Sequence, residues 1–182
     1  MANLPPLTLV LGGAASGKSG FAERLIVSRN SDAQRVYVAT AQPFDDEMRA
    51  KIDRHQEMRA SDGWITHEDP IEVASRLNMA TRDQIILLDC ATLWLTNQVM
   101  ARAELTQECS KLTRALRDCA ATVVVVTNEV GQGIVPEHAM SRHFREAQGR
   151  LNQHLAAEAQ LVVQVIAGLP QLLKGNMPDG VS

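Results

Sequence analysis

Short apolar runs alternate with amphipathic segments along almost the whole chain. The apolar runs predict buried strands at 7–11, 35–39, 84–89, 122–127 and 161–167, and a shorter run predicts an edge strand at 64–68. Helical periodicity lies between them, at 18–29, 45–59, 70–79, 92–103, 106–120 and 141–159. Because strands alternate with helices, we predict one α/β domain over residues 1–182, with a mostly parallel sheet flanked by helices on both faces. The run at 161–167 is predicted to be the last strand, and the tail from Gly168 to be poorly ordered at its end.

Ligands of such sheets bind beyond the carboxyl ends of the strands. That rule selects four segments as parts of a candidate site: 12–19, 40–46, 89–92 and 128–136.

The segment after the first predicted strand has the spacing of a phosphate-binding loop. It reads Gly12-Gly13-Ala14-Ala15-Ser16-Gly17-Lys18-Ser19 and leads into a predicted helix. Small residues let backbone N–H groups point inward, and the positive end of the following helix faces the same point. We therefore predict that this loop binds a nucleoside triphosphate, with Lys18 on the β- and γ-phosphates and the Ser19 hydroxyl on Mg²⁺.

Two further strand ends carry polar residues. Asp89 closes an apolar strand, and we predict that it holds Mg²⁺ directly or through water, although a surface carboxylate would look the same in sequence. Asn128 and Glu129 follow the run of four valines and open a loop with two glycines, whose position and polarity favour function over a purely structural loop.

The spacing of the histidines and arginines does not decide whether any of them is catalytic. The five histidines show no zinc-binding spacing, so for His55 a solvated position on a helix is the ordinary interpretation from spacing alone. In the long helix at 141–159, Arg142, Arg145 and Arg150 could supply a transition-state arginine or be surface charge.

The composition of the chain narrows the classes of partner that it is expected to bind. The net charge of −3 and the aromatic content of 3% argue against nucleic-acid binding. No signal peptide or membrane-spanning run is seen, and three cysteines without C-x-x-C spacing argue against disulfides and zinc, so a cytoplasmic location is expected.

From Leu7 to about Lys174 the chain resembles the bifunctional adenosylcobinamide kinase/adenosylcobinamide-phosphate guanylyltransferase family of cobalamin biosynthesis. The resemblance is carried by the phosphate loop and by the stretches 39–42, 45–48, 52–55, 127–136 and 144–153. It is most specific in Thr127–Pro136 followed by Phe144–Gln153.

The resemblance implies a RecA-like P-loop domain, assembled as a trimer, with two reactions. Adenosylcobinamide is phosphorylated by ATP or GTP, and GMP then passes from GTP to that phosphate through a GMP–histidine intermediate on the residue matching His55. A neutral imidazole is a suitable nucleophile for this step. The resemblance also implies contacts with the guanine nucleotide from Ala39, Thr40, Ala41, Gln56, Glu57, Met58, Arg59 and Glu68.

The chain departs from the family's pattern just after His55. Gln56 stands where the family usually has a basic residue, and Arg59 precedes Ala60 instead of proline. One additional residue before Glu68 makes its match less direct than that of His55.

Two alternatives stay open. A simple small-molecule kinase would use only the phosphate loop and give His55 no role. A RecA-like assembly ATPase or nucleotide switch would need a nucleic-acid or protein partner surface, which the acidic charge and the few aromatics disfavour for nucleic acid.

Overall fold

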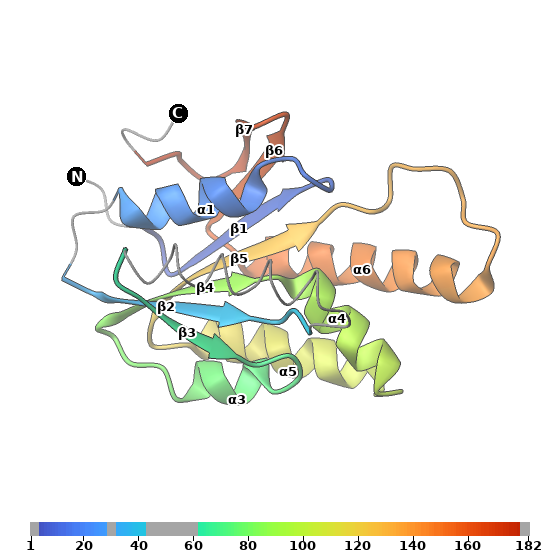
Figure 1. The fold of residues 1–182 in the computed structure, drawn as a ribbon, viewed down its shortest axis with the longest axis horizontal. Helices are drawn as coiled ribbons and strands as arrows, with labels where there is room; N and C mark the ends of the chain where they lie inside the picture. Colours follow the sequence, from blue (N-terminus) through green and yellow to red (C-terminus); the bar gives the residue numbers. More distant parts are fainter. Residues whose placement is uncertain (1–3, 29–31, 43–61, 179–182) are drawn as a thin grey trace.

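The computed structural model describes residues 4–28, 32–42 and 62–178. Within these residues the chain forms a seven-stranded sheet in the order β3-β2-β4-β5-β1-β6-β7 (Figure 1). The strands are β1 (Leu7–Gly12), β2 (Gln34–Ala39), β3 (Trp64–Glu68), β4 (Gln84–Asp89), β5 (Thr122–Asn128), β6 (Leu161–Ile166) and β7 (Leu169–Lys174). All neighbouring strands pair in parallel except β6 and β7.

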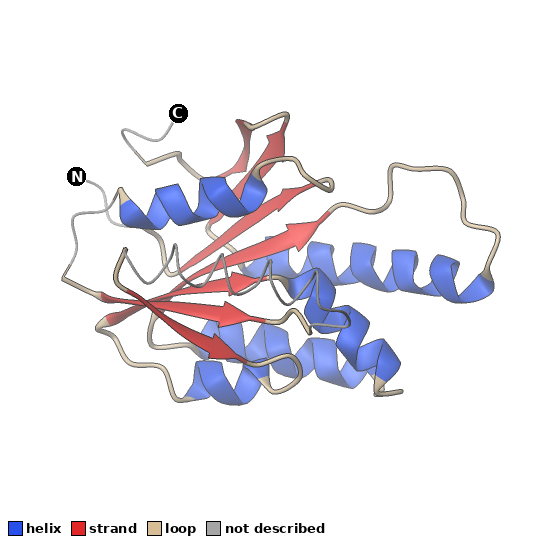
Figure 2. Cartoon of the chain, in the orientation of Figure 1, coloured by secondary structure: helices blue, strands red, loops and turns tan. Residues whose placement is uncertain are grey.

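Helices cover both faces of the sheet, as predicted (Figure 2). One face carries α1 (Lys18–Val27). The other carries α3 (Val73–Asn78), α4 (Ala91–Met100), α5 (Leu105–Asp118) and α6 (Ala139–Glu158). Each face has its own apolar core, and β1 contributes to both, since Leu7 and Leu9 face α4–α6 while Val10 faces α1. Burial on two sides explains why the central strands are continuously apolar.

The prediction that 161–167 is the last strand is wrong. The chain turns at Ala167 and Gly168, both with positive φ, and Leu169–Lys174 returns as β7 antiparallel to β6. A two-residue loop with positive φ at both positions matches the twist of a β-hairpin. Pro170 is tolerated because β7 is an edge strand, where a missing N–H leaves no neighbour unpaired.

The helix predicted at 70–79 is shorter, and α3 begins only at Val73. The carbonyl of Pro70 accepts a hydrogen bond from Asn97, and the carbonyl of Ile71 accepts from Trp94 and Gln98. Because α4 side chains occupy these carbonyls, the segment before Val73 stays non-helical. The helix predicted at 45–59 lies outside the described residues.

Candidate active site

The predicted phosphate loop connects β1 to α1 and requires glycine at two positions. A Cβ on Gly12 would lie 2.5 Å from both the Ser16 Oγ and the Val165 carbonyl oxygen. Gly17 has φ of +89°, which a residue with a side chain rarely adopts. The glycines therefore serve the fold of the loop as well as access to it.

The loop leaves its N–H groups available to an anion. Gly17 is the N-cap of α1 and offers no side-chain oxygen, so the first amides of the helix have no side-chain partner. Lys18 donates from Nζ to the Gly13 carbonyl at 3.2 Å, which folds its ammonium group back over the loop. Amides and ammonium together form a site for phosphate groups.

Polar residues at three strand ends lie on the same side of the sheet. Side chains alternate along a strand, and Trp64, Tyr37, Leu87 and Val126 all belong to the core on the α1 face. Glu68, Asp89 and Asn128 follow at even spacing and so project to that face too. The phosphate loop lies on this face as well, at the same carboxyl edge (Figure 1).

The strand register shows how far this edge extends. Ala39 pairs with Glu68 on one side and with Asp89 on the other, and Gly12 pairs with Asn128. Four strand spacings separate β1 from β3, about 19 Å at about 4.8 Å each. A nucleotide that touched both the loop and Glu68 would have to lie extended along the edge.

Asp89 is oriented by a neighbouring strand. The Tyr37 hydroxyl donates to its Oδ2 at 2.8 Å. Asp89 and Lys18 both act electrostatically on the thiol of Cys90, the residue that follows Asp89. Burial and the negative charge of Asp89 together raise the pKa of Cys90 to about 11, while Lys18 acts weakly in the opposite direction.

Thr40 is placed at this edge, but its polar groups serve the fold. Its hydroxyl donates to the Cys90 carbonyl and accepts from the Cys90 N–H, both at 2.8 Å, and the residue is fully buried. Its carbonyl accepts from Asn97 at 2.8 Å. Through these hydrogen bonds Thr40 joins the end of β2 to β4 and α4.

Five predicted site residues lie outside the described residues. They are His55, Gln56, Glu57, Met58 and Arg59.

The loop from Glu129 to His138 is tied to α6 by two arginines. Arg145 donates to the carbonyls of Gly131 and Ile134, and Arg142 donates to those of Pro136 and Glu137. Both arginines thus bind the loop backbone. Arg150, by contrast, makes an exposed ion pair with Glu146 at 3.6 Å.

A buried polar network beneath β5 was not predicted from the sequence. The Thr127 hydroxyl donates to Asn152 Oδ1 at 2.8 Å, and Gln148 Nε2 donates to the same oxygen and to the Thr127 hydroxyl. Thr92 reaches the network from α4. Gln148 and Asn152 are polar residues four apart on the apolar face of α6, a signal visible in the sequence.

The donor set fits a magnesium ion bound together with phosphate. Ser19 and Asp89 supply a hydroxyl and a carboxylate, and Mg²⁺ typically takes one or two such oxygens plus phosphate oxygens and water. Across residues 4–28, 32–42 and 62–178 no cluster of three or more His, Cys, Asp or Glu side chains could hold a metal alone. With Ser19 and Asp89 alone among the described residues, Mg²⁺ would need phosphate and water oxygens to complete its coordination.

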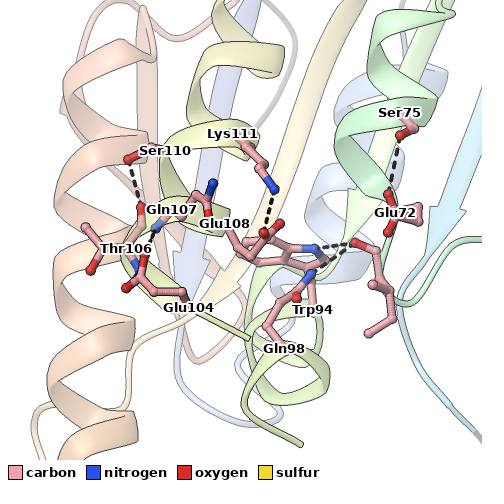
Figure 3. Close-up of polar contacts among 11 residues, drawn as sticks. Glu72, Ser75, Trp94, Gln98, Glu104, Thr106, Gln107, Glu108, Ser110 and Lys111 are labelled. Atoms are coloured by element: carbon pink, nitrogen blue, oxygen red, sulfur yellow. Dashed lines mark hydrogen bonds and ion pairs between the residues drawn. The ribbon is translucent and has the colours of Figure 1, made fainter. Parts of the chain in front are cut away.

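A pocket of about 560 Å³ lies between α3, α4 and α5, and Figure 3 shows polar contacts of several residues that line it. Two pairs of its polar side chains are in contact: Lys111 with Glu108 at 2.7 Å, and Ser75 with Glu72 at 3.4 Å. On one side of the pocket, Trp94 and Gln98 of α4 donate to the Ile71 carbonyl, as described above. These contacts indicate a packing junction outside the strand-end site.

Comparison with known proteins decides the family. The family model described as "Cobinamide kinase / cobinamide phosphate guanyltransferase" matches residues 8–173. The chain belongs to this family. It is 39% identical over 185 residues to the "Bifunctional adenosylcobalamin biosynthesis protein CobU" of Escherichia coli (strain K12), covering 92% of this chain and 99% of that protein. It is 40% identical over 186 residues to the protein of the same name from Salmonella typhimurium, with the same coverage.

A solved structure supports the fold independently of sequence. The flagellar accessory protein FlaH from Methanocaldococcus jannaschii aligns with a TM-score of 0.50 at 14% identity, covering 94% of this chain and 79% of that chain. Together with the phosphate loop and the strand order, this confirms the predicted RecA-like P-loop fold. Among the described residues, no helix is long and apolar enough to cross a membrane.

Proposed function

We propose that this protein catalyses both reactions for which its family is named. A nucleoside triphosphate phosphorylates the aminopropanol hydroxyl of adenosylcobinamide, and GMP is then transferred from GTP to the new phosphate. The observation that carries the proposal is the phosphate loop Gly12–Ser19, which shares one edge and one face of the sheet with Asp89 in a chain of this family. The products of the second step are adenosylcobinamide-GDP and pyrophosphate.

In the kinase step the substrate oxygen forms a bond to the γ-phosphorus, and the bond to the β–γ bridging oxygen breaks. Lys18 and the amides at the start of α1 hold the phosphates and offset the charge that develops on the departing diphosphate. Mg²⁺, held by Ser19 and Asp89, would add further neutralisation of phosphate charge.

In the guanylyltransferase step the resemblance assigns the nucleophile to His55. The imidazole nitrogen attacks the α-phosphorus of GTP and pyrophosphate leaves; an oxygen of adenosylcobinamide phosphate then attacks the same phosphorus and releases His55. Two transfers replace one difficult step.

Guanine recognition is assigned to the far end of the edge. The Glu68 carboxylate can accept from both the N1–H and the N2 amino group of guanine. Ala39, at the end of β2, pairs with Glu68 in the strand register, and Ala41 follows two residues later. Contacts from 56–59 and a homotrimer rest on the resemblance alone, whereas the expected cytoplasmic location rests on the composition of the sequence. Light scattering of the purified protein would test the trimer.

The experiment that tests the proposal uses two labels. With Mg²⁺ and α-³²P-GTP we expect acid-labile, base-stable label on the protein, and with γ-³²P-GTP we expect none. His55→Ala should abolish the α-label, whereas His67→Ala, a nearby histidine on β3 whose side chain projects to the opposite face from Glu68, should keep it. Absence of α-label from the wild type would reduce the function to a simple kinase.

A further inference from the structure

A single side chain holds together the segments that follow β2 and β3. Asn97 lies on α4, is only 4% exposed, and donates from Nδ2 to the Thr40 carbonyl at 2.8 Å and to the Pro70 carbonyl at 3.0 Å. Thr40 comes directly after β2, and Pro70 lies two residues after the end of β3. A carboxamide has two N–H donors, so Asn97 uses both of them to join two neighbouring strand ends.

Two more bonds fix the chain just after Glu68, the last residue of β3. The Asp69 N–H donates to the Ala39 carbonyl at 2.9 Å, and Asp69 Oδ2 accepts from Arg76 Nε of α3 at 2.8 Å. Together with the bond from α4, these contacts hold the short segment from β2, α3 and α4. The exposed side chain of Glu68 thus extends from a backbone that three neighbouring elements keep in place.

The position of these segments matters for the proposed guanine contact. Two guanine donors, N1–H and the N2 amino group, must each meet one oxygen of the Glu68 carboxylate. Ala39 and Ala41, on either side of Thr40, are proposed to contact the same nucleotide. A binding group must stay within about 0.5 Å of its productive position, so a change in the spacing between the two strand ends would cost one of the two bonds.

The next residue of α4 gives a comparison for a purely structural amide. Gln98 is 3% exposed and donates to the Ile71 carbonyl at 3.1 Å, to which Trp94 also donates. A buried amide on a helix is unfavourable unless it is bonded, and both Asn97 and Gln98 meet that requirement. Only the Asn97 bonds, however, reach the segment that contains Ala39 and Ala41 together with the one that follows Glu68.

We propose that Asn97 is a positioning residue for guanine recognition. It sets the spacing between the end of β2 and Glu68, so that the carboxylate meets both donors of the base. Both of its amide hydrogens are on main-chain carbonyls, so it acts through the backbone and makes no contact with the nucleotide itself. The inference rests on the proposed assignment of guanine to Glu68.

The test compares two nucleotides that differ at one group of the base. Inosine diphosphate (IDP) has the N1–H of GDP but lacks the N2 amino group. Calorimetry with Mg²⁺ measures the affinity of the full chain for each, in the wild type, in Asn97→Ala and in the control Gln98→Ala. We expect the wild type to bind GDP about tenfold more tightly than IDP, because IDP leaves one carboxylate oxygen without its donor. We expect Asn97→Ala to lose most of this preference and Gln98→Ala to keep it.

The ratio of the two affinities separates positioning from loss of stability. A variant that is partly unfolded binds both nucleotides less tightly by the same factor, so its preference for GDP stays unchanged. If Asn97→Ala does not fold, Asn97→Asp, which keeps the side-chain shape without the NH₂ group, is measured in its place. A wild-type preference in a folded Asn97 variant would overturn the proposal, and so would a wild type that binds GDP and IDP equally.

Failure of the proposed function would give a different result. A wild type that prefers GDP over IDP, but carries no label from α-³²P-GTP and transfers no GMP to adenosylcobinamide phosphate, would contradict the proposed function. The role of Asn97 in recognising guanine would then still be decided by the affinity ratio of its variants.

Discussion

The hydroxyl of Tyr37 donates a 2.8 Å hydrogen bond to the Oδ2 of Asp89. Tyr37 lies on β2 and Asp89 ends the adjacent β4, so the bond crosses between neighbouring strands. The tyrosine ring also packs edge-on against Trp64, with ring centroids 6.1 Å apart and planes at 84°. The orientation of a candidate metal ligand therefore depends on a side chain from another strand.

Tyr37→Phe is expected to weaken the use of Mg²⁺ while leaving the ring packing intact. Without the donor, Asp89 loses one restraint on its orientation, and we expect the Mg²⁺ concentration for half-maximal activity to rise about tenfold, the lower end of the range for losing an outer hydrogen bond to a metal ligand. A magnesium titration of kinase activity measures this. If the magnesium titration of Tyr37→Phe matches that of the wild type, the hydrogen bond does not orient Asp89 for metal binding.

Gly12→Ala is expected to distort the phosphate loop. The new Cβ would lie 2.5 Å from the Val165 carbonyl, a backbone atom that cannot move alone, so we expect a loss of about 1–3 kcal/mol in stability and a loss of nucleotide binding. Gly13→Ala is the matched control, because nothing lies within 4 Å of a Cβ there. Thermal melts and GTP binding compare the two; similar behaviour would contradict the close approach at Gly12.

Arg145→Ala is expected to release the loop after β5. Its guanidinium binds the Gly131 and Ile134 carbonyls, and the loop starts next to Asn128. We expect faster proteolysis within 129–138 and lower activity. Arg150→Ala, which removes only an exposed ion pair on the same helix, should leave both unchanged. Loss of activity with unchanged proteolysis would point to direct contact of Arg145 with substrate.

Asn152→Ala is expected to destabilise the protein by about 2–4 kcal/mol. It removes the oxygen to which the buried Thr127 hydroxyl donates and the amide that donates to the Asn128 carbonyl. Gln153→Ala, the exposed neighbour on α6, should change little. Urea unfolding of the two variants measures the difference, and equal midpoints would show that the network adds no stability.

Cys90 makes stability depend on alkaline pH. Its pKa is raised from 9.0 to about 11 by burial, so above pH 9 the thiol ionises in the unfolded chain but not in the folded one. Stability is complete below pH 9 and falls as the pH rises towards 11, by about 1 kcal/mol between pH 8 and 10 for this group. Urea unfolding at these two pH values should show a smaller fall for Cys90→Ala. The same slope in both proteins would contradict the assignment.

Local patterns in the sequence were enough to predict most of the strands and the phosphate loop. The strand at 84–89 has the predicted bounds, and the phosphate loop was predicted from eight consecutive residues, because apolar runs and glycine spacing act over one turn or one strand. Pattern alone also indicated that polar residues at strand ends would share one edge, since parallel strands end together.

Only the tertiary structure decided which atoms are free for chemistry. The resemblance implies a nucleotide contact for Thr40, and the structure adds that its hydroxyl bonds the main chain of Cys90, 50 residues away. For the arginines of α6 the sequence left surface charge and a transition-state role open, and the structure shows that Arg142 and Arg145 bind the backbone of a loop. β7 likewise forms because β6 offers it an edge, in a tail whose composition suggested disorder. Hydrogen-bond partners distant in sequence are set by strand register and helix packing, so only the folded chain shows that Asn97 holds the segments after β2 and β3 together.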